Sequence, residues 1–417
     1  MTSSKICVLF VDDEPNVLAA LKRMLRGKRD EWEMSFTDSG FAALALLEDS
    51  KFDVIISDIK MPGMDGADLL NKVKDEYPGM IRMALSGQVC LNEVMRSIRA
   101  VHQYISKPCK AQELIDKVEG AIKSRDILVD PAMQRLVTEI ESLPVIPSVF
   151  ESIERELKAD NPSIKKIAEY ISMDVGLVAK ILKLINSPYF GLSTHVDSIF
   201  HAITMLGLES LKALILSTHL FSMYNEEKLP NFSLNRLWDH SFRVSNIVRL
   251  ICECENIDKN TAIQARMTGL LHDIGKLILA NYFSDQYAEV IEKVSKTHKS
   301  IYDCELEVFG TTHAHLGAYL MGLWGISGDI VHGIGTYHQY TDFDLSIPML
   351  VRTADTIDHQ CVVINPDYVR IAFQKNILPE GKHGLLIEKW VNYVKDHWDG
   401  LDEFRALDAD LLAQLKN

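Results

Sequence analysis

The sequence predicts an α/β domain with a doubly wound, five-stranded parallel sheet, followed by an all-α domain. Over roughly the first 125 residues, short apolar runs alternate with helical patterns of about a dozen residues, which is typical of βα units. From about residue 131 onward, strand-like runs become rare and amphipathic helical stretches replace them. The length of 417 residues also exceeds what one hydrophobic core usually supports, so we expect two or three domains.

The composition is that of an ordinary globular protein, with 47% hydrophobic and 24% charged residues. No apolar run is long enough to span a bilayer and no signal peptide is recognisable, so we expect a cytoplasmic protein without membrane contact. A net charge of −14 argues against broad attraction to nucleic acid, and no motif indicates a DNA-binding domain. The close cysteine pair, Cys252 and Cys254, lacks a second pair to complete a zinc site, which favours free thiols.

Four apolar runs mark expected strands of the first domain, at residues 6–11, 54–57, 80–85 and 103–105. The polar residues at or just after their ends are Asp12, Asp13, Asp58, Ser86 and Lys107. Because the carboxyl ends of parallel strands meet at one edge of a sheet, these side chains are expected to converge. Three carboxylates in one crevice repel each other unless a cation joins them, and an all-oxygen site suits Mg²⁺. An ionised aspartate there can attack a phosphoryl group while the metal and the lysine neutralise charge.

The motifs around these residues resemble the receiver domain of two-component response regulators, over roughly residues 5–124. They are VDDE after the first strand, SDIKMPGMDG around Asp58, Ser86-Gly87, and YISKP at 104–108. Singly, each also fits a capping turn or a loop without chemistry, and their occurrence together and in order favours the resemblance. It implies a flavodoxin-like fold, a bacterial phosphorelay function, and phosphorylation of Asp58 by a cognate histidine kinase or phosphotransfer protein.

The same resemblance implies roles for individual residues. It implies a Mg²⁺ site formed by Asp12, Asp13, Asp58 and the backbone carbonyl of Lys60. Ser86 matches the switch hydroxyl that moves toward the phosphoryl group, and Tyr104 matches the aromatic residue that turns inward with it. Lys107 matches the lysine that pairs with the phosphoryl charge, and the peptide bond before Pro108 is expected to be cis.

The second domain is predicted to be helical, with stretches at 164–185, 198–220, 234–254, 261–281 and 314–323. An adjacent His272 and Asp273 inside an apolar helix, at 269–279, is costly unless the pair has partners. A metal ion is one such partner. Ligands that offer nitrogen and oxygen without thiolate suit Mn, Fe, Mg or Zn, and a metal-bound water could attack a phosphoester.

Sequence stretches in this domain resemble the HD superfamily, and more closely its HDOD branch, the HD-related output domain of bacterial signalling proteins. The stretches are LPVIP at 143–147, LINSPYFG at 184–191, AITMLG at 202–207, GLLHDIG at 269–275, and residues 313–324. The resemblance covers roughly residues 136–360. It implies four metal-ligand positions of an HD enzyme, at His240, His272, Asp273 and Asp355, with His313 and His338 as further candidates.

Two functions remain open for the helical domain. In the first it is a noncatalytic output module that contacts a downstream protein when the receiver is phosphorylated, which the HDOD resemblance favours. In the second it is a metal-dependent HD-type phosphohydrolase or cyclic-dinucleotide phosphodiesterase. The phosphodiesterase branch carries a His-His-Glu followed by Gly-Tyr-Pro, whereas this chain has Tyr337-His338-Gln339. A structural alternative is that His240 is a core histidine hydrogen-bonded to Asp273.

The expected organisation is a receiver domain at 1–124, a linker at 125–135, and an HD-like helical domain at 136–417. Within the last, the core ends near residue 360 and a helical extension follows. A helix is expected at 111–122, and the polar stretch after it marks the boundary. We expect phosphorylation of Asp58 to act by a population shift that alters the contact between the two domains. The oligomeric state stays open, with a homodimer among the alternatives.

Overall fold

The computed structural model describes most of both predicted domains. The described residues are 5–86, 97, 100–126, 128, 133–134, 137–138, 140, 144–145, 152–153, 155–156, 159, 162–186, 196–206, 222–223, 229, 232–297, 299–340, 344–361 and 382–397. The predicted Ser-Pro-Tyr-Phe-Gly stretch at 187–191, the stretch at 207–220 and the end of the extension at 398–417 lie outside them.

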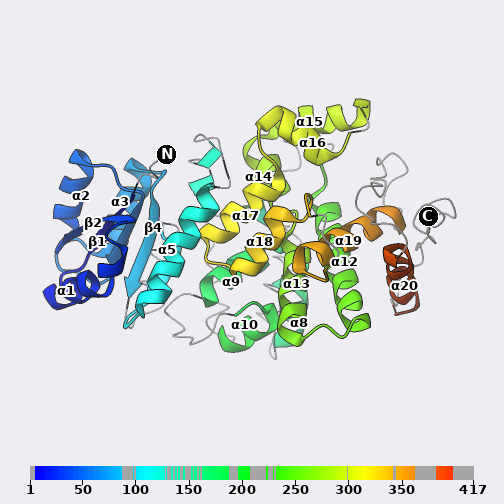
Figure 1. The fold of residues 1–417 in the computed structure, drawn as a ribbon, viewed down its shortest axis with the longest axis horizontal. Coiled ribbons are helices and arrows are strands. Elements are labelled where there is room, and N and C mark those ends of the chain that lie inside the picture. The colour runs from blue at the N-terminus through cyan, green and yellow to red at the C-terminus, as the bar shows by residue number, and fades with distance from the viewer. Residues whose placement is uncertain are drawn as a thin grey trace.

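The N-terminal domain is a five-stranded parallel sheet in the order β2-β1-β3-β4-β5. The strands are β1 (Ile6–Val11), β2 (Trp32–Thr37), β3 (Val54–Asp58), β4 (Ile81–Ser86) and β5 (Gln103–Ser106). The helices between and after them are α1 (Pro15–Met24), the 3-10 turn η1 (Arg26–Lys28), α2 (Gly40–Asp49), α3 (Gly66–Glu76) and α5 (Ala111–Asp126). This strand order confirms the predicted doubly wound fold, and β3 is buried along its whole length because helices cover the sheet (Figure 1).

The second part of the chain is mostly helical, as predicted. Its helices are α8 (Ile164–Ser172), α9 (Val175–Ile185), α10 (Ile199–Leu206), α12 (Leu234–Cys254), α13 (Lys259–Leu271), α14 (Ile274–Tyr282), α15 (Ser284–Thr297), α16 (Ile301–Phe309), α17 (His313–Leu323), α18 (Gly328–Thr336), α19 (Ile347–Cys361) and α20 (Lys382–His397). A short parallel pair joins β6 (Pro144–Val145) to β7 (Ser222–Met223). Among the helices in the described part of the chain, none is long and apolar enough to cross a membrane.

Two predicted helices are each two helices in the structure. The stretch 164–185 divides into α8 and α9 because the buried Asp174 accepts a hydrogen bond from the backbone N–H of Leu177 at 3.0 Å and so caps α9. The stretch 261–281 divides into α13 and α14 at His272 and Asp273. The prediction that this pair lies inside one helix was therefore wrong, and the pair occupies the turn between two helices.

The two parts share one continuous hydrophobic core, in which α5 packs against α17 (Figure 1). The buried side chain of Gln103, on β5, donates a hydrogen bond to the carbonyl of Gly322, on α17, at 2.8 Å. A Cβ atom on Gly322 would lie 2.1 Å from Oγ of Ser124, so only glycine allows α5 and α17 to approach this closely. The helical domain is thus docked directly on the β5–α5 face of the sheet domain.

A second link between the two parts runs through Thr138. Its carbonyl lies 3.1 Å from a guanidinium nitrogen of Arg82 and 3.0 Å from Nε2 of His102, and its hydroxyl lies 2.7 Å from the hydroxyl of Tyr319 on α17. Arg82 is 1% exposed, and its guanidinium also donates to the carbonyls of Pro78, Met80 and Ala100. These backbone acceptors satisfy the donors of a buried cation, which ties the segment around Thr138 to the sheet.

Candidate functional site

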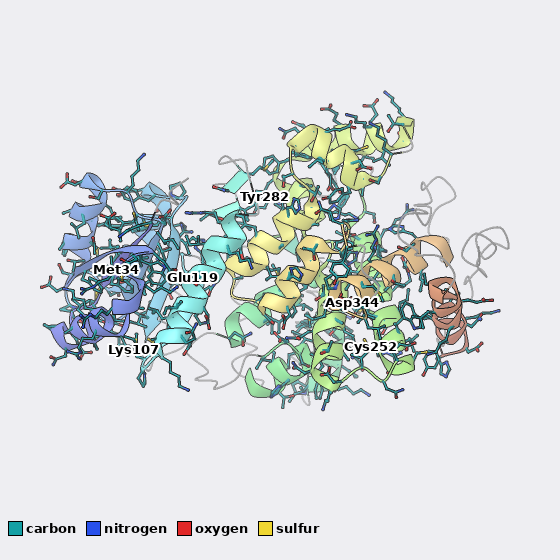
Figure 2. The ribbon with its side chains drawn as sticks, in the orientation of Figure 1. Met34, Lys107, Glu119, Cys252, Tyr282 and Asp344 are labelled. Atoms are coloured by element: carbon teal, nitrogen blue, oxygen red, sulfur yellow. The ribbon has the colours of Figure 1, made fainter. Side chains whose placement is uncertain are left out.

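An acid pocket lies at the carboxyl ends of β1 and β3, as predicted. Asp12, Asp13 and Asp58 each offer a carboxylate oxygen, and these atoms lie within 4.8 Å of one another. Lys107 reaches into the pocket from the segment after β5, with its Nζ 2.6 Å from Oδ2 of Asp12 and 2.8 Å from Oδ2 of Asp58. Figure 2 labels Lys107 at the lower edge of the sheet domain, beside α5. The structure therefore brings these four predicted residues together.

The electrostatics of this pocket favour an additional cation. Burial raises the pKa of Asp12, although hydrogen bonds from Lys107 and from the backbone of Glu14 oppose the rise. Burial works against the charged amine of Lys107, but its contacts with Asp12 and Asp58 outweigh that cost and raise its pKa. The ammonium group of Lys107 contacts two of the three carboxylates, and a hard divalent ion with oxygen ligands fits the remaining negative charge.

Of the other residues expected near this pocket, Lys60 contacts Asp58 directly. The backbone N–H of Lys60 donates to Oδ1 of Asp58 at 3.4 Å. Ser86 ends β4, and its side chain lies outside what the structure describes. Tyr104 is buried, and its hydroxyl lies 2.8 Å from Oγ of Ser97. The bond between Lys107 and Pro108 is cis, as the resemblance implied.

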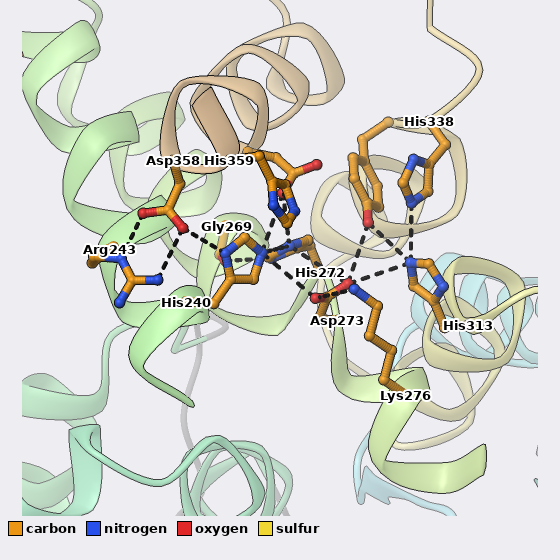
Figure 3. Close-up of polar contacts among 12 residues, drawn as sticks. His240, Arg243, Gly269, His272, Asp273, Lys276, His313, His338, Asp358 and His359 are labelled. Carbon is orange, nitrogen blue, oxygen red and sulfur yellow. Dashed lines mark hydrogen bonds and ion pairs between the residues drawn. The ribbon is translucent and has the colours of Figure 1, made fainter. Parts of the chain in front are cut away.

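A second polar cluster is buried inside the helical domain, where α12, the turn between α13 and α14, and α19 meet (Figure 3). Nε2 of His240 lies 3.2 Å from Nε2 of His272, 3.2 Å from Oδ1 of Asp355 and 3.6 Å from Oδ2 of Asp273. Metal bonds of about 2.1 Å place neighbouring ligand atoms about 3.0 to 3.4 Å apart. The four predicted ligand residues therefore converge at distances close to those around a single ion.

In both histidines of this quartet, Nδ1, the ring nitrogen that points away from the shared point, has a hydrogen-bond partner. Nδ1 of His240 lies 2.7 Å from Oδ2 of Asp358, and Nδ1 of His272 lies 2.7 Å from the carbonyl of Gly269. Arg243 in turn donates to both oxygens of Asp358, at 2.6 and 3.0 Å. With Nδ1 carrying the proton, each neutral imidazole directs an unprotonated Nε2 at the shared point, which is the usual arrangement behind metal-binding histidines.

The pKa values of the two histidines in the quartet shift in opposite directions. Burial alone would lower the pKa of His240, but hydrogen bonds to Asp355 and Asp358 outweigh it and raise that pKa to about 9. Burial lowers the pKa of His272 to about 4. His240 can thus carry a second proton, on Nε2, which a metal ion bound there would replace. The carboxylates hydrogen-bonded to His240 are Asp355 and Asp358 rather than Asp273, which corrects the alternative of a core histidine bonded to Asp273.

The further candidates His313 and His338 lie on the other side of Asp273. Nε2 of His313 is 3.3 Å from Oδ1 of Asp273, 3.0 Å from Nε2 of His338 and 3.1 Å from the hydroxyl of Tyr337. Oε2 of the buried Glu305 accepts from the backbone N–H of His313 at 2.8 Å and lies 2.5 Å from its Nδ1. On Asp273, the second oxygen is contacted by Nζ of Lys276 at 2.6 Å.

The close approach of α17 to the His272-Asp273 turn depends on Gly275. A Cβ atom at this position would lie 1.9 Å from the carbonyl oxygen of His313, so α17 could not begin where it does. The two helices pack together, and His313, the first residue of α17, is thereby placed beside Asp273. Glycine at the second position of α14 is thus part of how the cluster is built.

Four residues of this cluster were not identified from sequence: Arg243, Glu305, Asp358 and His359. Arg243 follows His240 by three residues, and Asp358 and His359 follow Asp355 by three and four, so each pair shares a helix face. That spacing was a usable signal. Glu305 has no comparable signal, because it reaches His313 from a separate helix, α16.

Comparison with known families assigns both parts of the chain. The response regulator receiver domain family matches residues 8–119, and the HDOD domain family matches residues 143–340. A hydrogenase transcriptional regulatory protein, HoxA of Cupriavidus necator, is 32% identical over 149 residues, which are 35% of this chain and 30% of HoxA. The heme response regulator HssR of Staphylococcus aureus is 32% identical over 120 residues, which are 28% of this chain and 52% of HssR.

A protein of Treponema pallidum is 24% identical over 208 residues, which are 49% of this chain and 39% of the relative. The chain therefore spans about half or less of the length of these curated relatives. Among solved structures, the MmoQ response regulator of Methylococcus capsulatus is 21% identical, with 66% of this chain and 98% of MmoQ covered and a TM-score of 0.47. The matched families, which include the acid pocket and the His240, His272 and Asp273 part of the buried cluster, identify the chain as a response regulator in which a receiver domain precedes an HDOD domain.

Proposed function

We propose that a histidine kinase or a phosphotransfer protein phosphorylates this response regulator on Asp58, and that the phosphorylated receiver controls protein contacts made by the HDOD domain. In this proposal Mg²⁺ is held by Asp12, Asp13, Asp58 and the backbone carbonyl of Lys60. When bound, the ion supplies charge neutralisation for the transferred phosphoryl group.

The acid pocket supports the chemical half of the proposal. A carboxylate oxygen of Asp58 attacks the phosphorus, and the bond between phosphorus and the donor's histidine nitrogen breaks, with its electron pair left on that nitrogen. Lys107 already contacts the carboxylates of Asp12 and Asp58, so its amine is in place to pair with the phosphoryl oxygens. Asp58 is 7% exposed, which leaves an edge of the carboxylate open to a donor.

The observation that carries the regulatory half is the pair Gln103 and Tyr104 on β5. Neighbouring residues of a strand point to opposite faces, and here Tyr104 contacts Ser97 while Gln103 donates to Gly322 of α17. A movement of β5 that accompanies a change at Tyr104 therefore reaches the docked helix directly. The same helix begins at His313, inside the histidine cluster. Phosphorylation thus has a short mechanical route from the receiver to the interior of the HDOD domain.

Asp58→Ala is expected to abolish phosphorylation. With Mg²⁺ and radiolabelled acetyl phosphate, the native chain should incorporate label, and Asp58→Ala should show only background. Asp30→Ala, which removes an exposed carboxylate outside the pocket, should be labelled like the native chain. Amide hydrogen exchange in α5 and α17 should change on phosphorylation of the native chain and stay unchanged in Asp58→Ala. Equal labelling of Asp58→Ala would disprove the phosphoacceptor assignment, and unchanged exchange in both helices would disprove the coupling.

A second candidate function for the HDOD domain is a metal-dependent HD-type phosphohydrolase, including cyclic-dinucleotide phosphodiesterase. The convergence of His240, His272, Asp273 and Asp355 favours it, because their nitrogen and oxygen atoms suit a divalent ion. When bound, such an ion lowers the pKa of a coordinated water. Lys276 and His313 would then lie beside Asp273, within reach of a phosphoester oxygen.

Hydrolysis assays with Mn²⁺ separate the two candidates. We expect the native chain to hold divalent metal and to leave cyclic dinucleotides and phosphomonoesters intact. His272→Ala should weaken metal binding by at least about 10-fold, because it removes a ligand nitrogen. Turnover by the native chain that disappears in His272→Ala would overturn the noncatalytic proposal in favour of the hydrolase.

A further inference from the structure

Three imidazoles, rather than two, surround Asp355. Oδ1 of Asp355 lies 3.2 Å from Nε2 of His240, 3.8 Å from Nε2 of His272 and 3.3 Å from Nε2 of His359. His359 follows Asp355 by four residues on α19, so both side chains leave the same face of that helix. The rings of His240 and His359 are 4.8 Å apart between centroids.

The geometry joins two overlapping groups of metal-ligand atoms. One group consists of His240, His272 and Asp273, and the other consists of His240, Asp355 and His359, and within each the ligand atoms lie within 4.8 Å of one another. The side chains of Asp355 and His359 are only 11% and 10% exposed. One divalent ion would satisfy the buried carboxylates and the imidazole nitrogens together, because it accepts electron pairs from both kinds of atom.

We propose that His359 is a fifth protein ligand which, together with the HD quartet, holds one divalent transition-metal ion. The quartet consists of His240, His272, Asp273 and Asp355. This inference rests on the metal site considered for the second candidate function and adds a residue to it. Three imidazoles and two carboxylates suit Mn²⁺, Fe²⁺, Co²⁺ or Zn²⁺ better than Mg²⁺, which prefers oxygen ligands and retains its waters.

A fifth ligand changes what the ion can do. An ion bound by the quartet alone keeps two of six octahedral positions, enough for an attacking water and for a substrate oxygen. With His359 bound, one position remains, so water and substrate cannot both coordinate. The ion becomes a resident cross-link between α12, the His272-Asp273 turn and α19. The HDOD domain is then stabilised by metal without becoming a hydrolase.

Titration with Co²⁺ alone tests the role of His359. The full-length chain is freed of metal with a chelator and titrated while the visible absorption of Co²⁺ is recorded, since this absorption depends on coordination number. With excess Mg²⁺ present to occupy the acid pocket of the receiver, the native chain should bind one Co²⁺ ion in the helical domain. His359→Ala should weaken Co²⁺ binding by at least about 10-fold and alter the spectrum. His332→Ala removes an exposed histidine of α18 and should leave affinity and spectrum unchanged. His359→Phe keeps the ring without the nitrogen and guards against an effect of lost packing.

The outcomes separate this inference from the site on which it rests. If the native chain binds no Co²⁺, the quartet site fails and the role of His359 fails with it. If His272→Ala loses the ion while His359→Ala and His359→Phe retain native affinity and spectrum, the quartet site stands and the inference is overturned. X-ray absorption of the Co²⁺-loaded native chain gives a test without variants, because it counts bound imidazoles. Three bound imidazoles support the proposal, and two bound imidazoles refute it.

Discussion

Gly275→Ala is expected to destabilise the HDOD domain by about 3 kcal/mol, at the upper end of the usual cost of overpacking. The added Cβ would lie 1.9 Å from the carbonyl oxygen of His313 and 2.6 Å from its carbonyl carbon. These are backbone atoms at the start of α17, and no rotamer change can move them. Relief requires α17 to shift away from α14, which also separates His313 from Asp273. Urea unfolding followed by circular dichroism at helical wavelengths measures the loss.

Gly328→Ala is the matched control for this prediction. Gly328 lies at the exposed start of α18, and a Cβ atom there would meet nothing within 4 Å. Alanine favours helix over glycine by up to about 1 kcal/mol, so the control should be neutral or slightly more stable than the native chain. Equal stability of Gly275→Ala and Gly328→Ala would show that α14 and α17 can separate at little cost.

The sheet domain was largely predictable because its strands carry continuous apolar runs. Strands β1, β3, β4 and β5 begin and end within one residue of the predicted runs. No continuous apolar run marks β2 (Trp32–Thr37), in which Trp32, Met34 and Phe36 alternate with polar residues. An edge strand with one exposed face shows alternating apolar and polar residues rather than a continuous apolar run. Residues 32–37 have this alternation, which also indicates a strand.

The histidine cluster was predictable as a set of residues but not as an arrangement. Motif resemblance supplied His240, His272, Asp273 and Asp355, which the fold brings together from three segments. The helix break at His272 escaped prediction because 269–279 contains no proline, and the apolar residues on both sides of His272 and Asp273 continue a helical pattern. The hydrogen bond between Gln103 and Gly322 joins residues 219 positions apart and depends on domain docking. No local pattern records such a contact.

Asp358→Ala should be more damaging than Gly275→Ala, with an expected loss of about 3 to 5 kcal/mol in unfolding free energy. Asp358 is fully buried and accepts from both Arg243 and His240. Burial would raise the pKa of Asp358, but its hydrogen bonds with His240 and Arg243 outweigh burial and lower it, so the carboxylate is charged at neutral pH. Its removal leaves the guanidinium of Arg243 largely buried without this partner, and desolvation of that charge is the source of the cost.

Metal binding gives this prediction a second, independent readout. Without Asp358, Nδ1 of His240 loses the acceptor that fixes its proton, and Nε2 is no longer oriented toward the metal-ligand position beside Asp355. Loss of such a partner typically weakens metal binding by about 10 to 100-fold, even where the ligands themselves are intact. Glu292→Ala removes a carboxylate from an exposed pair with Lys296 and should change stability by less than about 0.5 kcal/mol, with metal affinity unchanged. If Asp358→Ala lost stability but kept native Co²⁺ affinity, Asp358 would serve Arg243 alone, and the orientation of His240 would have to come from the packing of α12 against α19.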